Sequence, residues 1–318
     1  MIKPYNANIS ASVRARLLNL AKAQGEEFQN TLTRFGIERI LYRLSQSEHN
    51  DTFVLKGASL FAFWTGKIHR PTQDIDLLGR GSTDPERLRA IFESVCEQPV
   101  ADDGLRFLTD TIQVTNVRED EQYDGNRITL MAMLGNSRIP IQIDIGFGDT
   151  IIPPPVKVEY PTLLDMPSPH LFVYPRETVI AEKFEAMVDL GIGNSRMKDF
   201  YDIWYLAKQF DFDGASLARA IDSTFERRRT HLPTSPPLAL TSEFATDSAK
   251  QTQWNAFIKK NALAAQVPHL DILIEQMASF LMPPLQSIHA ANEFQQTWDF
   301  QQQAWESKGS KEAEDVGS

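Results

Sequence analysis

The sequence predicts an α+β protein in which a domain built on a mixed sheet precedes a helical domain. Period-two alternation dominates between residues 111 and 147, and helical periodicity dominates from residue 176 onward. A proline-rich stretch, IIPPPVKVEYP, separates the two patterns and is unsuited to a helix or a central strand. The predicted domains are therefore 1–155, with N-terminal helices and the sheet, and 156–306, which is helical. Residues 307–318 form a predicted disordered tail.

Each element follows from periodicity and from capping or turn residues. Two helices, a short buried strand and a short helix open the chain over 8–24, 26–47, 53–55 and 58–65. An acidic strand, a helix capped by Asp84 and three further strands follow over 73–78, 85–97, 111–117, 126–134 and 138–147. The second half contains predicted helices over 176–190, 196–209, 214–229, 240–263, 268–281 and 289–306, with a break at Pro283 and Pro284.

Composition narrows the class of protein. The chain has 318 residues, of which 42% are hydrophobic, enough for two cores. It contains one cysteine and no apolar run of about 18 residues, and its N-terminus lacks the apolar core of a signal peptide, so we expect a cytoplasmic protein. A net charge of -10 counts against a broad nucleic-acid-binding surface and leaves only local basic patches, such as Arg227 to Arg229.

Three acids are predicted to share the polar face of the sheet. Asp74 and Asp76 lie two apart in the strand of RPTQDIDLL, so both side chains point to one face. In RIPIQIDIGF, four isoleucines alternate with polar residues, which places Asp144 opposite a core face. If the two strands are neighbours, the three carboxylates converge.

Converging carboxylates are the ligands that Mg²⁺ or Mn²⁺ prefers together with water and substrate phosphates. Bound ions of this kind stabilise the attacking and leaving oxygens of an in-line phosphoryl transfer. The pattern thus predicts a metal-dependent transfer at Asp74, Asp76 and Asp144. The structural alternative is a polar sheet face with solvated acids.

Two further spots are candidates for phosphate binding. The turn at Lys56, Gly57 and Ser59 lets the backbone approach an anion before a helix begins, the alternative being an ordinary turn glycine, which the motif taken alone favours. In ETVIAEKFEAM, Lys183 lies on or beside an inward stripe, where a lysine is costly to bury without an anion. It is therefore a candidate to bind a triphosphate. In RMKDFYDIWYLA we expect Asp202 to orient Lys183 or a catalytic group, the alternative being a surface pair.

The ordered set K-G-A-S-L, R-x-T-x-D-I-D-L, I-D-I, E-K-F-x-A and R-x-K-D-x-x-D-I resembles the AbiEii/AbiGii toxin family of nucleotidyltransferases. The match runs from Lys56 to Leu206. The resemblance implies a DNA polymerase beta-type nucleotidyltransferase domain joined to a helical domain. It also implies the toxin of a toxin–antitoxin or phage-abortive-infection system, which transfers a nucleotide from an NTP, in several relatives to the 3′ end of tRNA.

The resemblance also assigns roles. Asp74 and Asp76 match the metal-binding acids, Thr72 the hydroxyl residue before them, Lys183 the nucleotide-contacting lysine and Asp202 the last motif acid. Gly57 and Ser59 match the glycine motif, Lys56 precedes it, and Asp144 fits the third acid of the wider superfamily; at Ala58 the chain departs from the family's second glycine.

The predicted cofactor is Mg²⁺ or Mn²⁺, the substrate an NTP, the acceptor tRNA or another RNA, and the partner an antitoxin from an adjacent gene. Two alternatives stay open at this point. One is nucleotide transfer to a small molecule or a protein hydroxyl, which the acidic composition favours. The other is a non-catalytic protein that binds an NTP and a partner.

Overall fold

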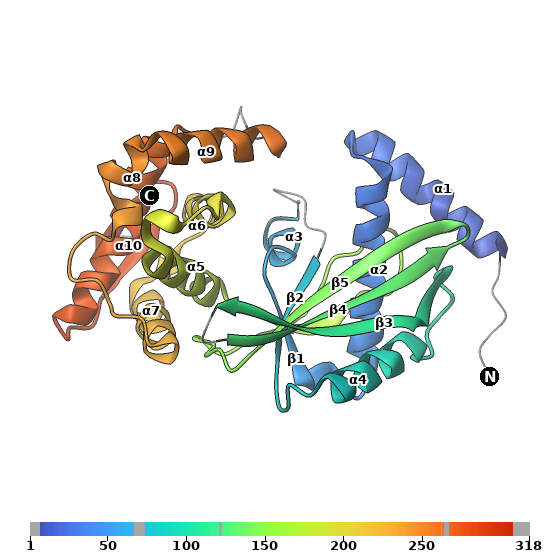
Figure 1. Ribbon diagram of the computed structural model, residues 1–318. Helices are drawn as coiled ribbons and strands as arrows, with labels where there is room; N and C mark the ends of the chain where they lie inside the picture. The colour runs from blue at the N-terminus through green and yellow to red at the C-terminus, as the bar shows by residue number, and fades with distance from the viewer. Residues whose placement is uncertain (1–6, 67–73, 121–122, 262, 264–266, 308–318) are drawn as a thin grey trace, which may run out of the picture. The chain divides into compact units, whose positions relative to one another are not determined.

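The chain forms two compact units. The computed structural model describes residues 7–66, 74–120, 123–261, 263 and 267–307. The sheet unit comprises residues 1–149 and 155–174, and the helical unit comprises residues 150–154 and 175–318 (Figure 1). The sheet unit extends past the predicted boundary because residues after 155 add two strands to its sheet. The predicted tail lies outside the described residues, except for Ser307.

The sheet unit holds a seven-stranded mixed sheet of order β3-β4-β5-β2-β1-β7-β6. The β2–β5 and β1–β7 pairs are parallel and the other pairs are antiparallel, which confirms the predicted mixed sheet. Its strands are β1 (Phe53–Lys56), β2 (Asp74–Gly79), β3 (Leu105–Asp120), β4 (Tyr123–Leu134), β5 (Ser137–Phe147), β6 (Val156–Glu159) and β7 (His170–Val173). Its helices are α1 (Ala7–Gln24), α2 (Phe28–Gln46), the 3-10 turn Asn50–Thr52, α3 (Leu60–Thr65) and α4 (Pro85–Glu97).

Helices α2 and α4 contact each other and cover one face of this sheet. Helix α2 crosses β5 at Gly36, where an added Cβ would stand 3.0 Å from atoms of Ile139 and Ile141. The four isoleucines of β5 are all buried, as the alternation predicts, at Ile139, Ile141, Ile143 and Ile145. The alternate residues of β5 therefore point to the opposite face of the sheet.

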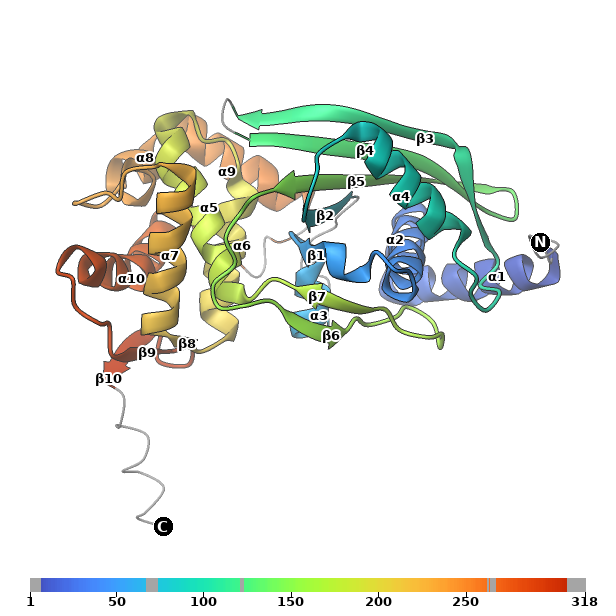
Figure 2. The same cartoon turned by 90° about the horizontal axis from the view of Figure 1, so that it is seen from below.

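The helical unit packs its helices around an apolar core and closes with a small antiparallel sheet of order β10-β9-β8 (Figure 2). Its helices are α5 (Arg176–Leu190), the 3-10 turn Gly191–Gly193, α6 (Met197–Gln209), α7 (Gly214–Arg228), the 3-10 turn Leu238–Leu240, α8 (Ser242–Thr246), α9 (Ser248–Lys260) and α10 (Leu270–His289). Its strands are β8 (Phe212–Asp213), β9 (Gln296–Asp299) and β10 (Ala304–Ser307). Among the described residues, no helix is long and apolar enough to cross a membrane.

The predicted helix over 240–263 is two helices. Asp247 separates α8 from α9 because its backbone is extended and its side chain accepts a hydrogen bond from the Lys250 backbone N–H at 2.9 Å. A capping aspartate ends one helix and begins the next.

The predicted break at Pro283 and Pro284 does not occur, since α10 continues to His289. A proline inside a helix costs about 3 kcal/mol. The helix buries an apolar face on both sides of this pair, including Leu281 and Leu285, and that packing outweighs the cost.

The predicted helix over 289–306 is also wrong, because this segment forms β9 and β10. Trp298 and Trp305 lie directly opposite each other, with ring centroids 5.5 Å apart. Cross-strand aromatic pairs stabilise an antiparallel pair, and this pair outweighs the helix propensity of the surrounding glutamines.

Candidate active site

Four charged residues line up across four neighbouring strands of the sheet. The strand register pairs Lys56 with Asp76, Asp76 with Asp144, and Asp144 with Arg127. Residues opposite each other in register share a face of the sheet, so this charged row lies on one face. Asp144 alternates with the buried isoleucines of β5, so this is the face turned away from α2 and α4.

Asp74 belongs to the same face, two residues before Asp76 on β2, and its register partner on β5 is Gln142. Asp74 and Asp76 are both half-buried. The structure therefore brings Asp74, Asp76 and Asp144 to one face of adjacent strands, as the alternation predicts.

Asp144 is held by a cation on the next strand. Arg127 donates from Nε and from its NH2 nitrogen to the two carboxylate oxygens, at 2.7 and 2.9 Å. The Gln142 amide donates a further hydrogen bond to Oδ2 at 3.1 Å. A bidentate guanidinium fixes the plane of a carboxylate as well as its charge. Asp144 is thus an oriented and neutralised acid in this structure.

Gly57 fits against Asp76. Its φ is +74°, in the left-handed region that glycine tolerates, and a Cβ built there would lie 1.8 Å from Asp76 Oδ2. Only a residue without a side chain leaves this space for the carboxylate. The glycine predicted to admit a phosphate therefore also sets the position of Asp76.

The rest of the glycine turn is polar and partly buried. Lys56 Nζ lies 3.0 Å from Asp149 Oδ2, and the Tyr160 hydroxyl donates to the Ser59 carbonyl at 3.0 Å. The Ser59 hydroxyl is buried and has no hydrogen-bond partner among the residues that the structure describes. A buried hydroxyl without a partner is costly, so Ser59 keeps the candidate role that the sequence predicts for it.

Within the part of the chain that the structure describes, this region holds four carboxylates, at Asp74, Asp76, Asp144 and Asp149, and two cations, at Lys56 and Arg127. Over the described part of the chain, no group of three or more His, Cys, Asp or Glu side chains is arranged to hold a metal ion. Mg²⁺ commonly uses only one or two carboxylates and completes its shell with water and phosphate, so Asp74 and Asp76 fit it as a pair.

Thr72, predicted as a nucleotide-binding residue, lies outside the described residues. Its role stays a prediction from the sequence.

The helical unit contains a second charged cluster. Lys183 on α5 contacts two acids of α6, Asp199 Oδ1 at 2.5 Å and Asp202 Oδ2 at 3.0 Å. Arg196 Nε lies 2.8 Å from Asp199 Oδ2. Asp202 is fully buried, and the Lys183 side chain keeps 14% of its surface exposed. The anion that a lysine in this position requires is therefore supplied by α6.

Asp199 remains ionised despite full burial. Burial raises the pKa of its carboxyl, but Lys183 and Arg196 lower it by more, so that the pKa lies below its ordinary value. Asp202 raises it slightly, as a neighbouring acid does. Two acids and a lysine thus form one coupled group with a partly exposed ammonium.

The sequence does not predict the residues that contact the candidate site residues. These are Arg127 and Gln142, which contact Asp144, Asp149, which contacts Lys56, and Asp199, which contacts Lys183. The signal for Asp199 was its position three residues before Asp202, on the same side of α6. Arg127 had no signal, because only strand register places it beside Asp144.

Comparison with protein-family models gives a match over residues 39–276, to the family described as nucleotidyl transferase AbiEii toxin, type IV TA system. The matched range covers well over half of the chain and includes both charged clusters. The chain belongs to the AbiEii nucleotidyltransferase toxin family. It is therefore a nucleotidyltransferase that uses an NTP, and a toxin whose system includes an antitoxin.

Two solved structures show a distant likeness to this AbiEii protein. A proposed nucleotidyltransferase from H. pylori covers 80% of this chain and 93% of its own, at 15% identity and a TM-score of 0.44. A second Helicobacter pylori protein covers the same shares, at 14% identity and a TM-score of 0.42. No curated protein matches the sequence. At these values the likeness bears on neither the site nor the mechanism.

Proposed function

We propose that this AbiEii-family enzyme transfers a nucleoside monophosphate from an NTP to the 3′ hydroxyl of an RNA, with tRNA as the acceptor, and so blocks translation. The observation that carries the proposal is the cross-strand row in which Asp76 and Asp144 lie directly opposite each other, with Asp74 beside them. Paired carboxylates on a rigid sheet suit phosphoryl transfer, which depends mainly on positioning and charge stabilisation.

The reaction forms one bond and breaks one. The acceptor hydroxyl oxygen forms a bond to the α-phosphorus, and the bond from that phosphorus to the bridging oxygen breaks, which releases pyrophosphate. The hydroxyl proton passes to a carboxylate, for which we propose Asp144, because Arg127 and Gln142 fix its orientation. Asp144, whose two carboxylate oxygens Arg127 engages, is the third metal ligand that the sequence predicts.

We propose Asp74 and Asp76 as the principal ligands of a divalent ion, Mg²⁺ or Mn²⁺. Such an ion, when bound, neutralises phosphate oxygens and the developing charge on the leaving group. Two residues of the glycine turn position the other groups. Gly57 keeps space for the Asp76 carboxylate, and the buried Ser59 hydroxyl is proposed to donate a hydrogen bond to a phosphate.

Lys183 is the proposed phosphate-binding residue of the helical unit. Asp199 and Asp202 hold its ammonium in place. Asp202 is therefore a positioning residue that acts through Lys183. A lysine held between two acids offers a fixed positive charge, whereas a solvated lysine must first be ordered.

The test is to incubate the protein with total bacterial RNA, Mg²⁺ and each labelled NTP in turn, beside Asp76→Asn and an Asp110→Asn control. Asp110 is an exposed acid of β3, so its change alters the same charge away from the site. We expect a labelled RNA of tRNA size, a loss of at least about a hundredfold in Asp76→Asn, and unchanged labelling in Asp110→Asn.

Full activity in Asp76→Asn would contradict the assignment of this acid. If a protein or a small molecule is labelled and RNA is not, the acceptor is not RNA, and the assignment of the reaction as nucleotidyl transfer still holds. The net charge of -10 is the observation that favours this second acceptor class.

A further inference from the structure

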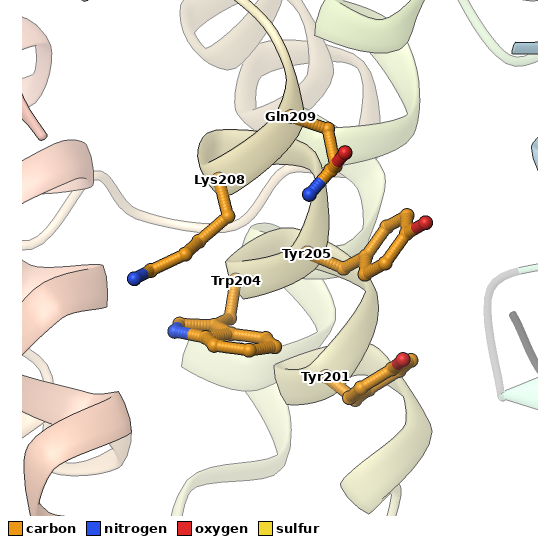
Figure 3. A pocket seen from close by; sticks show the side chains of 5 residues that line it. All are labelled: Tyr201, Trp204, Tyr205, Lys208 and Gln209. Atoms are coloured by element: carbon orange, nitrogen blue, oxygen red, sulfur yellow. The ribbon is translucent and has the colours of Figure 1, made fainter. Parts of the chain in front are cut away.

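A pocket of about 240 Å³ opens on the C-terminal half of α6, in the helical unit. It is lined by three aromatic residues, a lysine and a glutamine, at Tyr201, Trp204, Tyr205, Lys208 and Gln209. Figure 3 shows Lys208 above Trp204, and Tyr205 one turn from Tyr201. These are i, i+4 pairs, so each pair lies on one side of the helix.

The aromatic rings form a continuous wall. Tyr201 lies 5.8 Å from Tyr205 and 6.0 Å from Trp204 between ring centroids, and Lys208 Nζ stands 5.8 Å from the Trp204 centroid. The Trp204 indole N–H donates to Gln276 Oε1 at 2.7 Å, which fixes the ring. Tyr201 and Trp204 are buried, whereas Tyr205 and Lys208 are half-exposed and Gln209 is exposed. The wall is therefore rigid at its base and accessible at Tyr205.

We propose that this pocket stacks a nucleobase on Tyr205. A half-exposed ring offers a face for stacking, which contributes to binding of any base. The Gln209 side-chain amide has N–H donors and a carbonyl acceptor, so it can form hydrogen bonds with the edge of a base. Lys208 supplies a positive charge for a neighbouring phosphate. The volume is below the about 300–1,000 Å³ of pockets for drug-sized ligands, which matches a single base better than a whole nucleotide.

The position of the pocket links it to the proposed reaction. Tyr205 lies three residues after Asp202 on α6, so their Cβ atoms are roughly 5–6 Å apart. Asp202 in turn contacts the Lys183 ammonium at 3.0 Å. A base in the pocket would thus lie one helical turn from the proposed phosphate-binding lysine. This inference rests on the proposed function, and it adds a base subsite that serves either the NTP or the terminal nucleotide of the acceptor.

The experiment compares Tyr205→Ala and Tyr205→Phe with the wild type and with Tyr42→Ala. Tyr42 is the matched control, because it is a half-exposed tyrosine whose ring contacts a cation, Arg39, at 4.8 Å, and it lies on α2 of the sheet unit. The KM values for the NTP and for the RNA acceptor are measured separately. Binding of each NTP, of a short single-stranded RNA and of inorganic tripolyphosphate is measured by calorimetry.

We expect Tyr205→Ala to raise one of the two KM values roughly five- to 150-fold, the effect of losing one stacked base, while Tyr205→Phe and Tyr42→Ala stay near the wild type. A change in the NTP value assigns the base to the NTP, and a change in the RNA value assigns it to the acceptor. Tripolyphosphate affinity should not change, since it has no base. The proposal is overturned if neither KM moves, or if Tyr205→Phe loses as much as Tyr205→Ala.

The binding measurements separate this proposal from the proposed function. If the wild type labels no acceptor but binds an NTP or RNA, and Tyr205→Ala loses that binding, the base subsite stands and the transfer assignment fails. If the wild type binds none of the base-containing probes, the subsite itself is excluded.

Discussion

Gly57 is the residue on which the position of Asp76 depends most directly. Its left-handed backbone and the 1.8 Å approach of its absent Cβ to Asp76 Oδ2 are two separate constraints. Gly25, between α1 and α2, has a similar φ of +64° but nothing within 4 Å of its Cβ position. The two glycines therefore share the backbone strain that alanine would cause and differ in the steric contact.

We expect Gly57→Ala to reduce nucleotide transfer by at least about a hundredfold, because the Asp76 carboxylate must move. Both Gly57→Ala and Gly25→Ala should lose roughly 1 kcal/mol of stability through strain at positive φ. Transfer assays and thermal unfolding on both variants test this. Equal activity in the two variants would show that Asp76 tolerates displacement and is not the metal ligand.

The acids of the site were predictable from the sequence, and their partners were not. Alternation places Asp74, Asp76 and Asp144 on the polar side of their strands, since side-chain direction in a strand has a period of two. Arg127 meets Asp144 only because β4 and β5 pair in one register. Register depends on the turn and on the packing of the whole sheet, which a local pattern does not contain.

At the scale of elements, a buried glutamate joins α2 to the chain after β6. Glu38 Oε2 accepts a hydrogen bond from the Leu163 backbone N–H at 2.6 Å, and Oε1 lies 3.0 Å from the Arg39 guanidinium. Burial raises the pKa of Glu38 to about 7, although Arg39, the Leu163 N–H and Arg34 lower it. Asp103 raises it slightly further.

This pKa predicts how stability depends on pH. The folded value, about 7, exceeds the ordinary value of 4.5, so the folded state binds the proton more tightly than the unfolded state does. The contribution is fully present below pH about 4.5 and is lost as pH rises to about 7, on the order of 3 kcal/mol in total. In Glu38→Gln this group does not titrate, so the loss should disappear.

Urea unfolding at pH 5 and pH 8 measures the effect as the difference in the free energy of unfolding between the two conditions. Glu97→Gln, a change at an exposed glutamate of α4, is the control and should keep the wild-type difference. Glu38→Gln also leaves Arg39 without its carboxylate partner, which lowers stability by the same amount at both pH values. This cost cancels when each protein's stability at pH 8 is subtracted from its stability at pH 5. The same pH difference in the wild type and in Glu38→Gln would disprove the assignment.

The predicted elements are most accurate where one local pattern is strong and weakest where tertiary contacts decide. Helices α5, α6 and α7 follow their predicted ranges within one residue, because apolar stripes and the cap at Asp213 agree. The segment containing β9 and β10 is predicted from the sequence to be helical. Its strands depend on the Trp298–Trp305 pair and on β8, to which β9 bonds. That partner is distant in sequence, so no local window could reveal it.

For the whole molecule, the acidic balance requires that any RNA-binding charge be local. Lysine and arginine number 32 against 42 acids. Some of these cations are already engaged within the fold. Arg228 contacts Glu182 and Glu185, so the Arg227 to Arg229 cluster predicted as a basic patch presents Arg227 and Arg229 at the surface. An RNA acceptor would therefore be bound by a few cations against a repulsive background.

This balance makes the salt dependence of the acceptor KM the sharpest test of the acceptor class. Each phosphate neutralised on a single strand contributes a slope of about -0.7 in log affinity against log salt. Three to four such contacts, or a slope of roughly -2 to -3, would raise the RNA KM about 15- to 60-fold between about 50 and 200 mM salt. Measuring the NTP KM over the same range at fixed Mg²⁺ controls for effects on the catalytic site. If the acceptor KM instead changes no more than the NTP KM does, the acceptor carries no extended phosphate backbone. The transferred nucleotide then goes to a protein or small-molecule hydroxyl.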